Sequence, residues 1–253
     1  MTPRVPALVA LLTLLLTGCA TAPQGANKDA RKDPRDPFEG FNRASYAFTD
    51  AVDRAALKPV AKGYKAIAPQ FVETGVTNFF SNLGTTTTIV NDLLQAKFMD
   101  GLNDTGRLLM NTTLGIGGLF DPASKLGFDK NDEDFGQTLG KWGVPSGPYL
   151  WIPLFGPSTI RDGVGSGVGI FTDPLHYVER DAWRYSLNGL EVIDARARQL
   201  DLDQTIQSTY DKYGFIRNAY LQRREYQVTD GAAAPPPVDY EGLEDPDPNA
   251  DKK

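Results

Sequence analysis

The chain of 253 residues is poor in the residues that build covalent and metal-linked sites. It holds one cysteine and one histidine, so it forms no internal disulfide and offers no Cys and His set for zinc. Its formal net charge of −6 lacks the basic footprint of a nucleic-acid-binding protein. After the N-terminal leader, no stretch reaches about 18 consecutive apolar residues, so the mature chain contains no isolated membrane-spanning helix. The composition, 41% hydrophobic and 23% charged, excludes a polytopic membrane protein and a wholly disordered chain.

The N-terminus has the pattern of an export signal. Arg4 supplies a positive charge, and residues 5–16 are almost entirely apolar. This run is shorter than the roughly 20 residues that a spanning helix needs. Leu16-Thr17-Gly18-Cys19 follows it directly and resembles the lipobox of bacterial lipoproteins. The sequence therefore predicts a signal peptide over residues 1–18.

The lipobox resemblance implies that Cys19 becomes the first residue and carries lipid. A diacylglyceryl group joins its thiol and a further acyl chain, such as palmitate, joins its amine. Two or three chains hold a protein at a membrane far more firmly than one chain does. Ala20 resembles an outer-membrane address, because an Asp at this place favours the inner membrane in enteric-type bacteria. The polar segment 19–36 is interpreted as a lipidated flexible tether.

Residues 37–228 carry repeated helical patterns. Apolar side chains recur with helical spacing from Phe41 to Ala55, after a cap and a first-turn proline. The spacing returns over Phe71 to Leu83, where Gly84 is expected to end the helix. A separate short helix is predicted to start at Pro59 and run to Ala68. Further helices are predicted over residues 86–97, 100–114, 134–142, 181–200 and 206–220. The domain is expected to be all-α, and the acidic, proline-rich segment 229–253 to be a disordered tail. Periodicity alone favours a soluble bundle over a body embedded in one leaflet.

Two glycine-rich segments interrupt these patterns. The apolar run from Gly115 to Pro122 fits either a buried turn or a mobile hairpin beside a lipid path. The run from Gly143 to Gly156 mixes aromatic residues with prolines, so it cannot form a regular helix and suits the core or a membrane interface. Arg161 and Asp162 follow, either as a structural ion pair or as lining of a channel.

A search for catalytic motifs finds none. Ser166 and Ser146 lack the flanking glycines of a Gly-x-Ser-x-Gly nucleophile elbow. His176 lies in a segment that looks like a helix start, which favours a structural or surface histidine. Phosphate-binding glycine loops are absent, and the acidic segment around residue 131 fails the calcium-loop pattern. We therefore expect no enzyme activity, no cofactor and no metal.

Several short motifs follow one another along the chain. The first is Asp36-Pro37-Phe38-Glu39-Gly40-Phe41-Asn42-Arg43. The motifs that follow in order are Asn78-Phe79 with residues 81–83, residues 107–112 with Gly115, Gly117 and Gly118, residues 134–140, Gly147-Pro148-Tyr149 through Asp162, and residues 220–224. Each motif is modest alone, but six in order behind a lipobox are specific. In this order the motifs resemble those of the MlaA/VacJ lipoproteins, and the resemblance covers residues 36–228.

The resemblance implies a ring-like or disc-like assembly of amphipathic helices with an apolar rim and a central amphipathic channel. Such a protein lies in the periplasmic leaflet of the outer membrane of a Gram-negative bacterium. It admits phospholipids misplaced in the outer leaflet and passes them to a soluble periplasmic carrier of the MlaC kind, which maintains lipid asymmetry. Family members associate with trimeric porins, and this component uses no nucleotide or metal.

We carry two sets of candidate residues forward from this resemblance. The candidate membrane rim comprises Phe41, Phe48, Phe79, Phe80, Trp151 and Phe155. The candidate channel gate or lining comprises Gly115, Gly117, Gly118, Leu119, Phe120, Arg161 and Asp162. The alternative function is a tethered envelope scaffold that binds porins without transporting lipid.

The first prediction concerns the anchor. Replacing Cys19 with Ser removes the acceptor thiol, so the protein is expected to lose its place in the outer-membrane fraction. Membrane fractionation of cells that produce the Cys19→Ser protein measures this. Unchanged outer-membrane fractionation would refute the lipid anchor.

Overall fold

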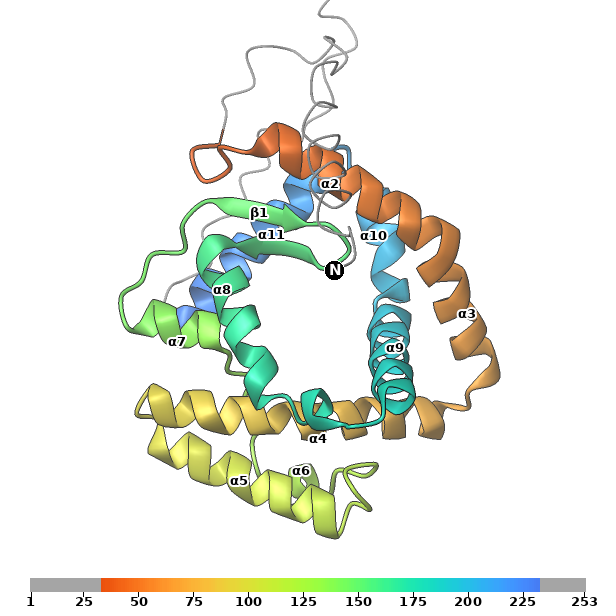
Figure 1. Ribbon diagram of the computed structural model, residues 1–253, viewed down its shortest axis with the longest axis vertical. Coiled ribbons are helices and arrows are strands. Elements are labelled where there is room, and N and C mark those ends of the chain that lie inside the picture. Colours follow the sequence, from red (N-terminus) through yellow and green to blue (C-terminus); the bar gives the residue numbers. More distant parts are fainter. Residues whose placement is uncertain (1–32, 233–253) are drawn as a thin grey trace, which may run out of the picture. The chain divides into compact units, whose positions relative to one another are not determined.

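The computed structural model describes residues 33–232, so the predicted signal peptide, Cys19, most of the tether and nearly all of the tail lie outside the described residues. The chain divides into two units between Pro34 and Arg35, and the elements below belong to the second unit. This unit is helical apart from two short strands, which confirms the all-α prediction (Figure 1). The α-helices are α2 Glu39–Val52, α3 Lys58–Ile67, α4 Gln70–Leu94, α5 Phe98–Thr113, α6 Pro122–Lys125, α7 Phe135–Lys141, α8 Ile160–Gly169, α9 Asp181–Arg198, α10 Asp203–Gln207 and α11 Lys212–Val228.

The first two predicted helices are joined without a break. Between α2 and α3 lies η2, a π-helical turn over Asp53–Leu57. The amide of Lys58 donates to the carbonyl of Asp53, five residues back. The wider turn carries the helix up to Pro59, which lies at the start of α3 and has no N–H to donate. Pro59 therefore does not interrupt the helix.

Helix α4 also differs from prediction, because it runs through Gly84 instead of ending there. A glycine inside a helix costs about 1 kcal/mol relative to alanine, which tertiary packing readily outweighs. Helix α5 packs along α4. Helix α4 ends at Leu94, shortly before Ala96 adopts a positive φ of 60°. The 3-10 turns η3, η4 and η5 span Ile170–Thr172, Pro174–Tyr177 and Leu200–Leu202.

The segment predicted to be non-helical forms a small antiparallel hairpin. Strand β1, Tyr149–Ile152, pairs with β2, Gly156–Thr159, and Tyr149 lies opposite Thr159. Leu154 and Gly156 take positive φ in the connection. Tyr149 and Trp151 point into a buried aromatic cluster with Tyr213.

The helices and strands of this unit pack against one another in a closed circuit. Helix α2 packs on β1, α3 packs on α9, and both α9 and α7 pack on α4. Helix α8 packs on α7 and on β2, which completes the circuit. Figure 1 shows these elements running around the middle of the view, with α5 and α6 outside α4. The unit is thus a ring of helices closed by the hairpin, as the resemblance implied.

The distribution of polar and apolar side chains is inverted relative to a water-soluble domain. Within residues 33–232, eight hydrophobic side chains are buried, against seventeen polar or charged ones. Large apolar side chains such as Phe71, Phe98, Met99 and Phe155 are mostly exposed. No helix in this part of the chain is both long and apolar enough to cross a membrane. The helices are therefore amphipathic, with their polar faces turned inward.

A pair of buried carboxyl groups lies between α4 and α5. Asp92 is fully buried, both its oxygens lack a donor, and Asp104 is buried beside it. Burial, followed by the charge of Asp104, raises the pKa of Asp92 to about 7. The charge of Glu133 acts in the same direction. The carboxyl group of Asp92 therefore holds its proton more firmly than an exposed carboxyl group does.

This pair generates a stability prediction. A pKa raised above the ordinary 3.8 means that the stability contribution of Asp92 is present in acid and is lost as pH rises through about 7. Asp92→Asn keeps a neutral, donating side chain, so at pH 8 it should raise the free energy of unfolding by about 1–3 kcal/mol. The gain should vanish near pH 5, as measured by denaturant unfolding in detergent. The exposed control Asp129→Asn should change little at either pH, and equal effects of the two variants would contradict the raised pKa of Asp92.

Candidate functional site

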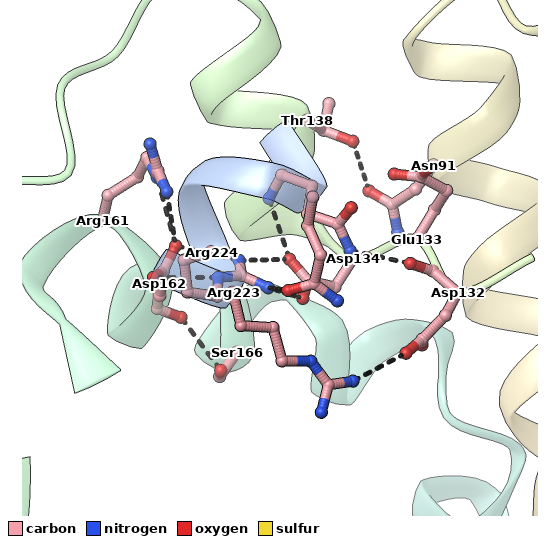
Figure 2. A network of polar contacts seen from close by, with 12 residues as sticks. Asn91, Asp132, Glu133, Asp134, Thr138, Arg161, Asp162, Ser166, Arg223 and Arg224 are labelled. Carbon is pink, nitrogen blue, oxygen red and sulfur yellow. Dashed lines mark hydrogen bonds and ion pairs between the residues drawn. The ribbon is translucent and has the colours of Figure 1, made fainter. Parts of the chain in front are cut away.

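Arg224 is the centre of a buried ionic network that joins three helices (Figure 2). From α11, its guanidinium donates to Asp162 of α8 at 2.9 and 3.1 Å, and to Asp134 at 2.6 and 2.9 Å. Asp162 also accepts from Arg161 at 3.0 Å and from the hydroxyl of Tyr220 at 2.8 Å. Burial opposes ionisation of Asp162, but the hydrogen bonds and charge of Arg224 outweigh it and hold its pKa below the usual range. The network thus fixes α7, α8 and α11 in one arrangement.

Two glycines let these helices approach closely enough for the network to form. A Cβ on Gly165 would lie 2.4 Å from the backbone nitrogen of Gly136. A Cβ on Gly136 would lie 2.6 Å from both Arg224 and Asp162. Asp134 caps α7 by accepting from the amide of Gln137 at 2.8 Å. The glycine-rich motifs around these positions are therefore packing requirements.

The opening motif of the domain closes the circuit at α2. The buried Asp36 accepts from Asn42 at 2.7 Å, from the hydroxyl of Tyr213 at 2.5 Å and from Arg217 at 3.1 Å. The amide side chain of Asn42 also bonds one edge of β1, donating to the carbonyl of Tyr149 and accepting from the amide of Trp151. One short motif therefore ties α2 to β1 and α11.

A pocket of about 270 Å³ lies where α4, α8 and α9 meet, and these elements border the middle of the ring in Figure 1. Its wall is amphipathic. The apolar part includes Phe80, Leu83 and Leu175, and the polar part includes Thr87, Ser166, Asp173 and Glu191. Burial, followed by the charge of Asp173, raises the pKa of Glu191. We call this the inner pocket.

The structure separates the six candidate rim residues into two groups. Phe41, Phe48 and Phe155 are exposed, and Phe155 is 86% exposed. Trp151 and Phe80 are buried, so their assignment to the rim is corrected. Trp151 belongs to the aromatic cluster because strand alternation turns it inward with Tyr149. Phe79 is partly buried against Phe80, with ring centroids 5.2 Å apart.

The candidate gate residues do not line the inner pocket. Gly115, Gly117, Gly118, Leu119 and Phe120 form a tight turn between α5 and α6. Backbone amides in this turn donate to the carbonyls of Thr112, Asn111 and Gly115 at 2.9 Å. A Cβ on Gly115 would lie 2.3 Å from two carbonyl oxygens. These contacts fold the turn back onto the end of α5.

Arg161 and Asp162, the other two gate candidates, are buried and paired with each other at 3.0 Å. Their structural interpretation fits the contacts. The inner-pocket side chains escaped sequence reasoning, because Thr87, Ser166 and Glu191 stand in no motif and meet only through the fold. Arg224, by contrast, stands in the last of the family motifs, but no role was assigned to it.

Within residues 33–232, no three His, Cys, Asp or Glu side chains group as a metal site. The hydroxyl of Ser166, in the inner pocket, donates to the carbonyl of Asp162 at 2.9 Å. The fold and the inner pocket together define a helical ring that turns apolar residues outward and polar residues inward.

Comparison with known proteins agrees with this class. The chain belongs to the MlaA lipoprotein family, which its residues 34–227 match. It is 35% identical, over 90% of both chains, to the intermembrane phospholipid transport system lipoprotein MlaA of Escherichia coli. The Haemophilus influenzae protein of that name is 32% identical over 88% of this chain and 90% of its own. An uncharacterised protein of Rickettsia typhi is 36% identical over 81% of this chain and 82% of its own.

A solved structure also matches. It is 33% identical in sequence, and the superposition covers 76% of this chain and 98% of that chain with a TM-score of 0.67. That structure is described as a structural basis for maintenance of bacterial outer membrane lipid asymmetry. The sequence resemblance to the family is thereby confirmed.

The network around Arg224 generates a matched pair of variants. Arg224→Gln leaves Asp162 buried without its main partner, so the free energy of unfolding should fall by about 3–5 kcal/mol at pH 7. The neighbouring Arg223 is 71% exposed and lies 3.6 Å from an equally exposed Asp132, so Arg223→Gln should cost less than about 1 kcal/mol. Denaturant unfolding of both proteins in detergent measures the difference.

The pH dependence separates this account from simple loss of packing. In the parent protein, the contribution of Asp162 is complete above its unfolded pKa of 3.8 and is lost as pH falls further, because its folded pKa is lowered. In Arg224→Gln, protonation of Asp162 relieves a buried carboxylate that has lost its main partner, so the deficit in unfolding free energy should shrink as pH is lowered from 7 to 5. A deficit that is constant with pH would contradict the electrostatic role.

Proposed function

We propose that this chain is a lipid-anchored outer-membrane protein of a Gram-negative bacterium, embedded in the periplasmic leaflet. It takes phospholipids misplaced in the outer leaflet through the middle of its helical ring. It then passes them to a soluble periplasmic carrier of the MlaC kind. This is transport without catalysis, and it maintains the asymmetry of the outer membrane.

The inverted distribution of side chains carries the proposal. Exposing so many large apolar groups to water is unfavourable, at about 25 cal/mol for each Å² of apolar surface. Acyl chains are a favourable environment for the same apolar groups, but there a protein must satisfy its polar groups internally. The buried polar network around Asp162 and the contacts of Asp36 and Asn42 do this. An amphipathic ring that lies within one leaflet fits both requirements.

The inner pocket supports a route for lipid through the ring. A phospholipid that crosses a bilayer unaided carries its head group through about 30 Å of hydrocarbon. An unpaired polar group in such a medium costs several kcal/mol. Thr87, Ser166 and Glu191 offer polar contacts to a head group, while Leu83 offers an apolar contact to an acyl chain. The wall therefore suits both ends of a phospholipid.

The names of the relatives support the same proposal. The Escherichia coli and Haemophilus influenzae proteins are intermembrane phospholipid transport lipoproteins. A trimeric porin is the proposed neighbour in the membrane, and a periplasmic carrier is the proposed acceptor, because family resemblance implies both. The exposed Phe41, Phe48 and Phe155 are proposed to lie at the membrane rim.

The test blocks the inner pocket without disturbing the fold. Gly84 lines the pocket, and a Cβ there would meet no atom within 4 Å. Gly84→Trp should obstruct the route and raise outer-leaflet phospholipid to the level of cells that lack the protein. The measurement is the product of an outer-leaflet acyltransferase that consumes surface phospholipid.

Gly40 in α2 provides the control. A Cβ there also meets no atom within 4 Å, but Gly40 does not line the pocket. Gly40→Trp should therefore behave like the parent. If Gly84→Trp also behaves like the parent while the protein is present at normal levels, the inner route is wrong. If cells without the protein accumulate no surface phospholipid, the scaffold function is favoured instead.

A further inference from the structure

A second recess lies on the outer side of the ring. It is a groove of about 850 Å³ between the first turns of α4 and the segment that holds the tight turn and α6. Its lining shares no residue with the inner pocket. The transport route therefore leaves this groove unused.

The walls of the groove are apolar and open. Phe71 from α4 is 77% exposed, Leu114 is 70% exposed, and Phe120 is 60% exposed. Leu119 completes the wall and Gly75 leaves space on α4, since a Cβ there meets Leu119 only at ordinary contact distance. An apolar recess of this size has the dimensions of a small-ligand site.

The wall formed by the turn is preorganised. The side-chain amide of Asn78 donates to the carbonyl of Leu119 at 3.3 Å, which fixes the turn to α4. Gly118 takes a φ of 93°, and a Cβ there would lie 2.7 Å from Asn82. A rigid wall binds a ligand without the entropic cost of ordering a loop.

One end of the groove carries an unbalanced positive charge. Gln70, Ser124 and Lys125 are the polar lining residues at α6 and at the start of α4. The acid in the lining, Asp121, pairs with Arg107 at 3.1 Å and accepts from Asn111 at 3.0 Å. Within residues 33–232, Lys125 has no ion-pair partner. The groove therefore offers apolar walls and one free cation.

We propose that this groove binds a phospholipid with a net negative head group, its acyl chain against Phe71 and Phe120 and its phosphate at Lys125. The occupant comes from the leaflet around the protein, so this inference rests on the membrane-embedded function proposed above. The site is a resident lipid site outside the ring, separate from the route through the middle. A free phosphate ion lacks the chain that the apolar walls would cover.

The test places a photo-reactive phenylalanine analogue at Phe120 in the full-length, lipid-anchored protein. The protein is reconstituted in vesicles of equal parts phosphatidylglycerol and phosphatidylcholine, irradiated, and the adducts are identified by mass spectrometry. Phosphatidylglycerol adducts should exceed phosphatidylcholine adducts about fivefold, the factor that one lysine near a lipid surface contributes. Lys125→Glu should abolish this preference, and Gly75→Leu should lower the yield of both adducts by filling the groove.

Lys130→Glu is the matched control, because Lys130 is exposed nearby but does not line the groove. It should keep the preference for phosphatidylglycerol. Equal adducts of the two lipids in the parent, or a preference that survives Lys125→Glu, would overturn the site. Added inorganic phosphate should leave the adducts unchanged, and their loss would show that the end of the groove takes free phosphate instead.

The Gly84→Trp background separates this site from the transport route. The adducts at position 120 should persist there, because the inner pocket and the groove share no lining residue. If the adducts persist while surface phospholipid fails to respond to Gly84→Trp, the lipid site in the groove is supported and the transport route through the inner pocket is contradicted. If no lipid adduct forms at position 120 although the protein is inserted in the vesicles, the lipid site in the groove is contradicted and the proposed transport route is unaffected.

Discussion

The ion pair between Arg224 and Asp162 is the interaction on which the rest of the structure depends. A protein that turns its apolar side chains outward cannot hold its helices together by burying them. It must join helices through polar contacts, and each buried polar group needs a partner because water is scarce around it. Arg224 meets Asp162 and Asp134 at once, and so joins α11 to α8 and to the start of α7. Asp36 and Asn42 do the same for α2, β1 and α11.

This arrangement gives the family motifs a physical meaning. Positions 136 and 165 need glycine because the backbones of α7 and α8 are in contact there. This close approach brings Asp162 within reach of Arg224. Asn42 is buried because its side chain makes two hydrogen bonds to the backbone of β1. The motifs thus describe how the ring is closed. The residues that would contact a lipid, such as Thr87 and Glu191, lie outside them.

The sequence predicted the type and place of most helices, because their apolar stripes follow a helical period. It missed the continuity of α4 at Gly84, and that of α2 with α3 near Pro59. In both places tertiary packing and a π-helical turn overrode local propensity. The strand pairing of Tyr149 with Thr159 was also beyond reach, since a segment rich in proline and glycine predicts only that no helix forms. Sequence periodicity favoured a soluble bundle because it shows that a helix has two faces but not which face meets its neighbours.

Candidate site residues were harder to predict than the fold. Phe41 and Trp151 look alike as aromatic residues beside breakers, yet one is exposed and the other lies in the aromatic cluster. The glycine-rich turn at residues 115–120 looked mobile in sequence. Its glycines are instead required by close backbone contacts, and the turn lies away from the inner pocket. The pocket itself assembles side chains from α4, α8 and α9, which no local pattern relates.

We propose that phospholipid occupies the middle of the ring. A photo-reactive amino acid at Thr87 in the inner pocket, compared with one at the 86% exposed Phe155, tests this proposal. Both proteins are produced in cells, irradiated and analysed for covalent lipid. Phospholipid adducts are expected at both positions. Adducts at Phe155 with none at Thr87 would contradict the proposal, because the protein would then lie in the membrane without admitting lipid to its interior.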